Sequence, residues 1–335
     1  MKNAITASHN ARLHISGASQ LVKNFAILPF IIILVVGGAS VSNVFLSLNN
    51  LLNILNMSSI LMMVVAAQLL VLLVGEIDLS VESVVTLAPM CAALMMAPTT
   101  SGGVGYEWNG FAGILIAVLV GTVSGVINAF LVVNIRLNAF ITTLAMLILL
   151  RGLALGVGKG NTVYGLPDEF LYLGQGRVAG VPMPIWVAGV VVISMSIFLR
   201  YHWLGRSVYV VGSNPEAART AGINVSRVKW MVFVASGVLS AIAGVMLTGR
   251  IAAATSVQGA NLVFSVLAAA VIGGVSLNGG RGSVIGAFLG VLLLGLVQNI
   301  MVLAQVATYW IDATFGLIIV VALLLTRVVG GAQVR

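Results

Sequence analysis

Long apolar runs, separated by short polar segments, set the strongest limit on how this chain can fold. A helix needs about 20 mostly apolar residues to cross the hydrocarbon core of a bilayer, and ten runs of this kind follow one another along the sequence. We therefore expect an all-α polytopic membrane protein with about ten transmembrane helices. The expected spans are residues 25–42, 58–75, 81–97, 111–133, 139–158, 185–200, 230–249, 262–276, 283–305 and 310–327.

The composition excludes a soluble domain. Hydrophobic residues make up 60% of the chain and charged residues only 7%, whereas soluble domains carry about 25% charged residues. A net charge of +8 also occurs in nucleic-acid-binding proteins, but no Lys/Arg patch is interleaved with aromatic residues, so we expect no nucleic-acid partner. The only cysteine, Cys91, lies within an apolar run, and no intramolecular disulfide can form.

The basic residues predict which side of the membrane each loop faces. With a cytoplasmic N-terminus, twelve Lys and Arg residues lie inside and three outside, which agrees with the positive-inside rule. Both termini are therefore expected to be cytoplasmic. The expected organisation is a cytoplasmic N-terminal segment over 1–24, a transmembrane domain over 25–327 with a basic cytoplasmic loop over about 200–229, and a cytoplasmic tail over 328–335.

The first apolar run has a second interpretation. Its basic lead, the run FAILPFIIILVV and the small residues GGAS also outline a secretory signal peptide. The lead is long and Pro29 falls early in the run, which favours a retained first span. Cleavage would leave the later topology unchanged.

The basic loop contains the sequence SNPEAARTAG, which carries the start and stop signals of a short helix. Asn214 can cap the helix, Pro215 suits its first position, and Glu216 complements the positive end of the helix dipole. Gly222 can supply a left-handed stop. A helix of about two turns is marginal by itself. We expect it to rest either on anionic lipid, with the arginines as anchors, or on a partner protein.

Three carboxylates fall within the sequence GEIDLSVES, between the second and third spans. Glu76, Asp78 and Glu82 invite a cation-site interpretation, but a hard cation needs converging oxygen ligands and the sequence does not show convergence. Helix caps are favoured: Asp78 or Ser80 can cap the third span, with Glu82 in its first turn. We expect a structural or gating turn on the cytoplasmic side, with contact to a partner protein as the alternative, and no metal.

Polar side chains inside apolar spans are candidates for function because they are costly in the membrane. Arg151 is the strongest candidate for lining a solute path or holding a gate. Gln68, Asn128, Gln298 and Asn299 either face such a path or bond neighbouring helices. No Asp, Glu or His lies in the middle of an expected span, as a proton-coupled carrier would need.

Sequence motifs for ATP hydrolysis and for membrane-enzyme catalysis are missing. The chain has no GxxxxGK[ST] phosphate loop, no HExxH, no GxSxG and no Cys/His cluster, which are the usual signatures of these chemistries. We therefore expect no enzymatic activity and no bound cofactor. Energy for transport would then come from a partner protein.

Several stretches resemble the ribose-type permease family of ATP-binding-cassette importers. They are LVLLVGEIDLSVESVVTLA, FSVLAAAVIGGVSLNGGRGSVIGAFLG, NAFITTLAMLILLRGLALGV and LGRSVYVVGSNPEAARTAGI. The first is similar to the family's G-G-I-D-L-S-V-G-S signature, except that Glu76 and Glu82 replace two glycines. The last includes EAARTAG, which resembles the family's E-A-A-three-residues-G loop. The resemblance covers about residues 45–327.

The resemblance implies a permease subunit of the bacterial inner membrane that imports a small sugar, most simply a monosaccharide. It implies a separate ATPase subunit that uses ATP and Mg²⁺, a periplasmic sugar-binding protein, and a second permease copy, identical or paralogous. The sugar stays open, and autoinducers and polyols are included, because the family's binding protein sets affinity. The alternative is a secondary transporter of a neutral solute. The ATPase-coupling residues implied by the resemblance are Pro215, Glu216, Ala217, Ala218, Arg219 and Gly222.

Overall fold

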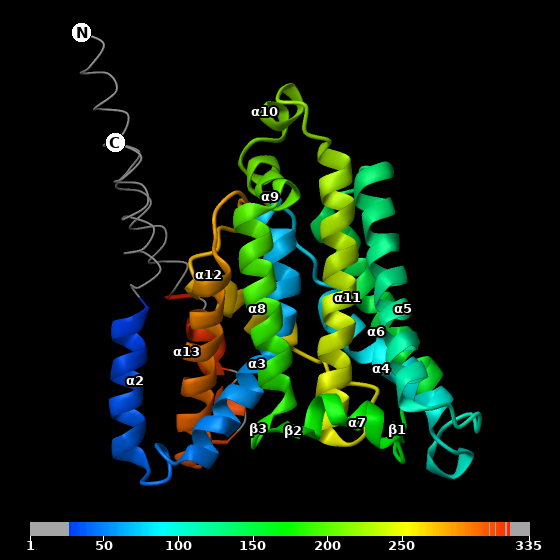
Figure 1. Ribbon diagram of the computed structural model, residues 1–335, viewed down its shortest axis with the longest axis vertical. Helices are drawn as coiled ribbons and strands as arrows, with labels where there is room; N and C mark the ends of the chain where they lie inside the picture. Colours follow the sequence, from blue (N-terminus) through cyan, green and yellow to red (C-terminus); the bar gives the residue numbers. More distant parts are fainter. Residues whose placement is uncertain (1–26, 308, 312, 319, 322–335) are drawn as a thin grey trace.

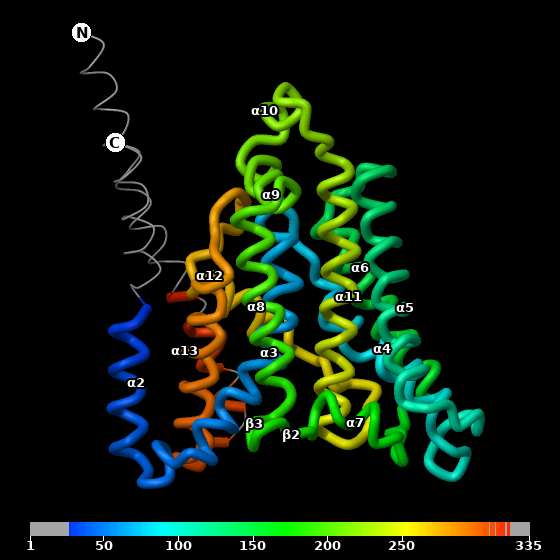
Figure 2. The backbone as a smooth tube through the Cα atoms, viewed as in Figure 1, coloured from blue at the N-terminus to red at the C-terminus, as the bar shows by residue number. Residues whose placement is uncertain are grey.

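The computed structural model describes residues 27–307, 309–311, 313–318 and 320–321. The described chain is mostly helical (Figure 1), and its backbone runs repeatedly between the two ends of the molecule (Figure 2). Six helices are long and apolar enough to cross a membrane, which confirms an all-α, multi-pass membrane protein. They are α3 (Leu48–Leu73), α5 (Gly110–Ala129) with its π-helical continuation η2 (Phe130–Asn134), α6 (Ala139–Gly158), α8 (Met183–Tyr201), α11 (Val225–Ile251) and α13 (Val284–Leu303).

Three shorter apolar helices accompany them, namely α2 (Leu28–Val41), α4 (Val81–Met96) and α12 (Leu262–Ile272). Each of the first nine expected spans coincides with one of these nine helices. The largest difference is at α3, which begins at Leu48 instead of residue 58. The last expected span and the two terminal segments lie partly or wholly outside the described residues, so the total of ten spans remains a prediction.

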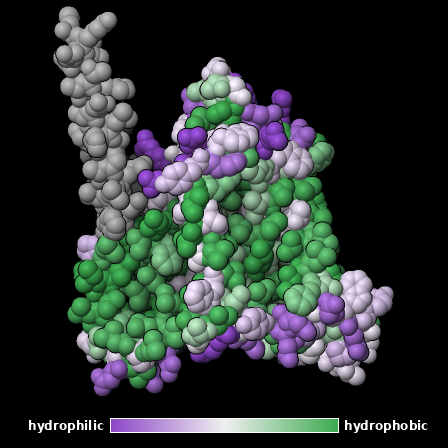
Figure 3. All heavy atoms as spheres, viewed as in Figure 1, coloured by the Kyte–Doolittle hydropathy of each residue, from purple (hydrophilic) through white to green (hydrophobic). Residues whose placement is uncertain are grey.

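Small elements gather at the two ends of the bundle (Figure 1). The end called the α10 end carries α9 (Trp203–Ser213) and α10 (Pro215–Thr220). The opposite end, called the α7 end, carries the elements α7 (Asp168–Gln175), η1 (Thr99–Ser101), β1 (Thr162–Val163) paired antiparallel with β4 (Ala254–Thr255), and β2 (Arg177–Val178) paired antiparallel with β3 (Val181–Pro182). Figure 3 shows a broad apolar band between two more polar ends.

The helices α3 and α11 form much of the buried centre. Residues 62–73 of α3 are all buried. The helix α11 crosses α5 closely because glycines lie at the crossing: a Cβ atom on Gly121 would lie 2.4 Å from the carbonyl oxygen of Gly237, and one on Gly125 would lie 2.5 Å from that of Phe233. Small residues permit such close packing inside a membrane, where hydrophobicity does not drive helices together.

Two non-helical segments enter the bundle from opposite ends. Residues 74–80, the first inserted segment, connect the end of α3 at the α10 end to α4, and residues 252–261, the second inserted segment, lead from the α7 end to α12. The second inserted segment contacts α4, the helix that follows the first inserted segment, because the backbone N–H of Gly259 donates a hydrogen bond to Thr86 Oγ1 in α4 at 3.0 Å. The signature sequence GEIDLSVES, expected as a turn on the cytoplasmic side, therefore descends into the bundle. Figure 1 shows α4 beginning well below the upper end of α3.

Candidate functional site

The short helix α10 projects from the α10 end, and its ends are those predicted from the sequence (Figure 1). Asn214 Oδ1 accepts hydrogen bonds from the backbone N–H groups of Glu216 and Ala217, both at 3.0 Å. Gly222 has a φ of +78°, the left-handed conformation that glycine adopts without strain. The local sequence therefore specifies where this helix begins and ends.

Most side chains of α10 are free to meet a partner. Glu216 and Arg219 form an ion pair on the exposed surface. Ala218 faces inward and is fully buried. The other residues expected to contact an ATPase are exposed, namely Pro215, Ala217 and Gly222.

A glycine junction, made of Gly75, Gly212, Gly279 and Gly280, lies directly beneath α10. It brings together α9, the end of α3 and the turn between α12 and α13. A Cβ atom on Gly212 would lie 1.8 Å from the carbonyl oxygen of Leu73, and the backbone N–H of Gly280 donates to that same oxygen at 2.9 Å. No side chain separates the backbones at these contacts, so α9 packs directly against the end of α3 and the turn between α12 and α13.

An ion pair makes a second connection near the α10 end. Lys229, in α11, pairs with Glu76 in the first inserted segment. The two side chains are 21% and 20% exposed, so water screens the pair only partly. Because α11 follows α10 after a short link, this pair ties the first inserted segment to the helix that leaves α10.

Asp78 lies inside the bundle, and its partners are hydroxyl and N–H groups. Its Oδ1 accepts hydrogen bonds from the backbone N–H and the Oγ of Ser80 at 2.9 and 2.6 Å. Its Oδ2 accepts one from Ser236 Oγ of α11 at 3.3 Å, and Asn128 of α5 donates to Ser80 Oγ at 2.7 Å. These bonds fix the first inserted segment between α5 and α11. Neither expected side-chain cap reaches α4: Ser80 makes no capping hydrogen bond, and Asp78 accepts a hydrogen bond from the backbone N–H of Ser80, one residue before the helix.

Glu82 is buried in the first turn of α4 and connects two further elements. Its Oε1 pairs with Arg151 of α6; the Glu82 side chain is 3% exposed and the Arg151 side chain 45%. Its Oε2 accepts a hydrogen bond from the backbone N–H of Val263, at the start of α12, at 3.3 Å. The three carboxylates of the signature sequence thus have three separate sets of partners and do not converge on a cation.

These buried groups correct one inference from the sequence. We expected no carboxylate deep in the membrane domain, yet Asp78 and Glu82 are each only 2% exposed. The reason is that the first inserted segment carries them inward, although both residues lie at the edge of the expected spans. The protein therefore has buried carboxylates of the kind that a proton-coupled carrier needs.

The remaining polar residues of the expected spans lie in different surroundings. Gln68 is fully buried in α3, and its amide atoms have no hydrogen-bond partner among the described residues. Asn299 of α13 and Asn50 of α3 exchange hydrogen bonds of 2.9 and 3.0 Å, so Asn299 joins two helices. Gln298 lines a cavity of about 240 Å³ between α3, α12 and α13. The structure does not gather the five candidate path residues at one place.

Comparison with known proteins identifies the class of this chain. Residues 50–323 match the family model described as "Branched-chain amino acid transport system / permease component", and the chain belongs to this family of importer permeases. Among its relatives, the ribose import permease protein RbsC of Haemophilus influenzae is 34% identical over 90% of this chain and 92% of its own length. The L-arabinose ABC transporter permease protein AraH of Azospirillum brasilense is 34% identical over 92% of this chain and 88% of its own length. The ribose import permease protein RbsC of Bacillus subtilis is 33% identical over 98% of this chain and 99% of its own length. No solved structure matches the chain.

Three residues of these sites carry no local sequence signal, namely Lys229, Ser236 and Gln258. Gln258 holds the second inserted segment, because its Nε2 donates a hydrogen bond to the carbonyl oxygen of Val85 at 3.0 Å. Each of the three has a partner more than a hundred residues away in the chain. Spacing within one segment cannot reveal such pairs.

Proposed function

We propose that the protein is the membrane permease subunit of an ATP-binding-cassette importer that moves a small sugar, most simply a pentose, from the periplasm to the cytoplasm. Membership of the permease family supports the class. The sugar is supported by the relatives, whose names specify ribose and L-arabinose. In this proposal the subunit is not an enzyme and binds no cofactor, and a separate ATPase subunit uses ATP and Mg²⁺.

The observation that carries the proposal is the backbone connection that runs from α10 through the adjoining α9 to the membrane helices. A separate ATPase can drive transport only if its movement reaches the solute path. The helix α10 offers an exposed docking surface, and the glycine junction links the adjoining α9 to the ends of α3, α12 and α13. This is the arrangement that a coupling helix needs.

The proposal also fixes the orientation of the protein, with the α10 end facing the cytoplasm. The protein has about ten spans with both termini inside, and it lies in the bacterial inner membrane in contact with lipid. The permease domain covers 25–327, between the cytoplasmic segments 1–24 and 328–335. A periplasmic sugar-binding protein docks at the α7 end, and a second permease copy, identical or paralogous, completes the solute path.

Purification of the chain from its native membrane tests the proposal. A C-terminally tagged chain in mild detergent is expected to bring down an ATPase subunit in near-equal amount. Glu216→Lys and Gly222→Asp should abolish this recovery without changing membrane insertion, because the first alters the exposed surface of α10 and the second strains the left-handed turn that follows it. Glu169→Lys is the matched control, since it makes the same charge change on the exposed surface of α7 at the opposite end.

Two results would overturn the proposal. One is unchanged recovery of the ATPase with both α10 variants, which would remove the docking role. The other is a chain that purifies alone and takes up solute in ATP-free vesicles, driven by a proton gradient. That second result would make the protein a secondary transporter and α10 a helix resting on lipid.

A further inference from the structure

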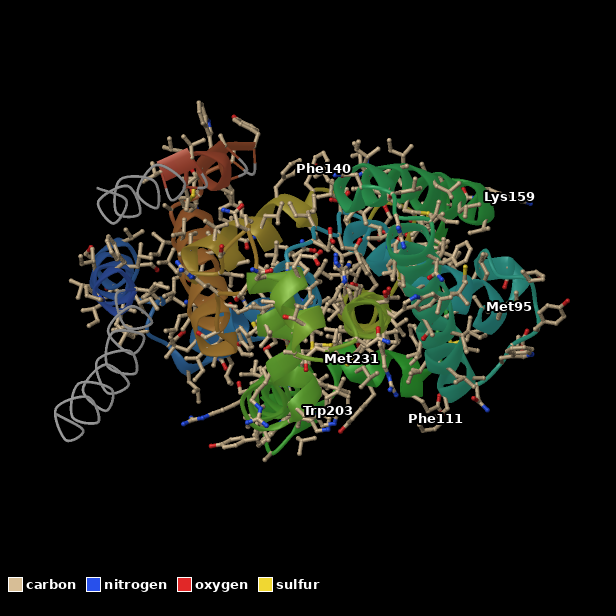
Figure 4. The ribbon with its side chains drawn as sticks, turned by 90° about the horizontal axis from the view of Figure 1, so that it is seen from above. Met95, Phe111, Phe140, Lys159, Trp203 and Met231 are labelled. Carbon is tan, nitrogen blue, oxygen red and sulfur yellow. The ribbon has the colours of Figure 1, made fainter. Side chains whose placement is uncertain are left out.

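Arg151 is placed where an isolated membrane helix could not hold it. It lies within α6, an apolar helix on the outer edge of the molecule, which runs between the labelled Phe140 and Lys159 in Figure 4. Its side chain is 45% exposed although its partner Glu82 is almost completely buried. A charged group facing hydrocarbon is strongly unfavourable, so the space in front of Arg151 must be polar.

Glu82 also prevents the arginine from reaching the membrane surface. Long basic side chains near helix ends commonly extend to the interface. Here the guanidinium is held by a carboxylate whose second oxygen bonds the N-terminus of α12 at Val263. Val263 is separated from the α10 end by the length of α12, whose 11 residues span about 16 Å. This is roughly half the thickness of a bilayer core, so Arg151 is exposed at mid-depth.

A second exposed region lies at the N-terminal end of α12. The second inserted segment reaches α12 through Ala260 and Asn261, and both are exposed although they lie within three residues of Val263. Non-helical backbone at this depth is tolerated only when protein buries it or water reaches it. Ala260 and Asn261 line the cavity that contains Gln298. The start of α12 therefore adjoins both the Glu82–Arg151 pair and this cavity.

We propose that Arg151, positioned by Glu82, forms part of the wall of the solute path at mid-depth and donates hydrogen bonds to hydroxyl groups of a passing neutral solute. The guanidinium carries five N–H donors, and Glu82 is its only hydrogen-bonding partner among the described residues. The carboxylate balances the positive charge, so the pair favours a polyhydroxylated neutral molecule over an anion. The proposal rests on the proposed function as a sugar importer. It assigns a positioning role to Glu82, which stands where the family signature has glycine.

Thiol labelling tests which side of α6 faces water. Leu155 lies one turn from Arg151 on the same side of the helix, and Leu153 lies on the other side; both are exposed, at 39% and 46%. Each is replaced by Cys in a Cys91→Ala background, and the assembled transporter is treated on both membrane faces with a cationic methanethiosulfonate. Leu155→Cys should react, whereas Leu153→Cys, facing lipid, should react roughly 50-fold more slowly because the reagent is charged. Equal rates at both positions would overturn the proposal.

Two further measurements examine the arginine itself and the path. Arg151→Cys combined with Glu82→Gly leaves no unpaired buried carboxylate, and its thiol should react as fast as that of Leu155→Cys. Modification at position 155 should stop ribose uptake, while modification at position 153 leaves it unchanged; unaffected uptake after complete labelling at 155 would also contradict the proposal. If the unlabelled transporter takes up no sugar at all, the proposed function fails. The labelling rates at positions 155 and 153 still show which face of α6 is exposed to water.

Discussion

At the scale of single residues, contacts between backbones matter as much as contacts between side chains. Gly212 is the clearest case, because its missing side chain lets α9 touch the end of α3. The sequence shows an unusual number of glycines but does not show which of them lie at contacts. Gly189, for example, has no atom within 4 Å of the position of a Cβ atom, although it lies in a membrane helix as Gly121 does.

Gly212→Ala is therefore expected to destabilise the protein and to uncouple it. The new methyl group would lie 1.8 Å from the carbonyl oxygen of Leu73, and overpacking of this kind costs roughly 1–3 kcal/mol. Thermal unfolding of the purified protein should show a lowered midpoint, and ATP-driven uptake should be lost. Gly189→Ala is the control, because an alanine in open space favours a helix and should not lower the midpoint. Equal midpoints for both variants would show that the glycine junction is not tightly packed.

The replaced signature glycines show what a sequence can and cannot reveal about single residues. Glu76 and Glu82 stand out from the sequence as departures from a glycine-rich signature. Their partners, Lys229 and Arg151, lie in other helices, and only the folded arrangement brings them close. The sequence therefore identified the unusual residues and placed Glu82 in the first turn of its helix, but it did not reveal the ion pairs.

At the scale of elements, the predictable parts are those whose ends are set locally. The helix α10 begins at an asparagine cap followed by proline and ends before a left-handed glycine, and all of these signals lie within nine residues. The inserted segments could not be predicted in the same way. Residues 252–261 are held by hydrogen bonds to distant residues of α4. Gln258 donates to the carbonyl oxygen of Val85, and the backbone N–H of Gly259 donates to Thr86 Oγ1.

Removing the cap of α10 should weaken docking of the ATPase specifically. Asn214→Ala removes two hydrogen bonds to backbone N–H groups, and loss of such a cap costs about 1 kcal/mol of helix stability. The short helix should fray, and the ATPase recovered with the tagged chain should decrease. Asn138→Ala provides a matched control, since Asn138 caps α6 through the N–H of Ile141 at 3.2 Å and lies away from α10. A similar decrease with both variants would point to general destabilisation.

At the scale of the whole molecule, hydropathy identifies a membrane protein but not its interior. The helices α3 and α8 are similarly apolar, yet their apolar stretches are 78% and 22% buried within the molecule. In a lipid environment, a helix at the centre and a helix at the edge are both surrounded by apolar groups. The order of the spans was therefore predictable, whereas their packing was not.

Reporter fusions test the orientation of the molecule. Alkaline phosphatase, which is active only outside the cytoplasm, should be inactive when fused after Arg335 and active when fused after Gly103. The expectation follows from the twelve basic residues assigned to the cytoplasmic side and the rule that such residues collect there. An active enzyme after Arg335 together with an inactive one after Gly103 would invert the topology and place α10 outside.

The short helix α12 has a consequence for the biogenesis of the protein. Its 11 residues are about half of the 20 needed to cross a bilayer, so α12 cannot be retained as an independent span when it leaves the ribosome. It reaches its place only once α13 has been synthesised and inserted behind it. Insertion of this chain therefore includes a true folding step within the membrane. The bond between Glu82 and the start of α12 can form only when α12 is in its final place.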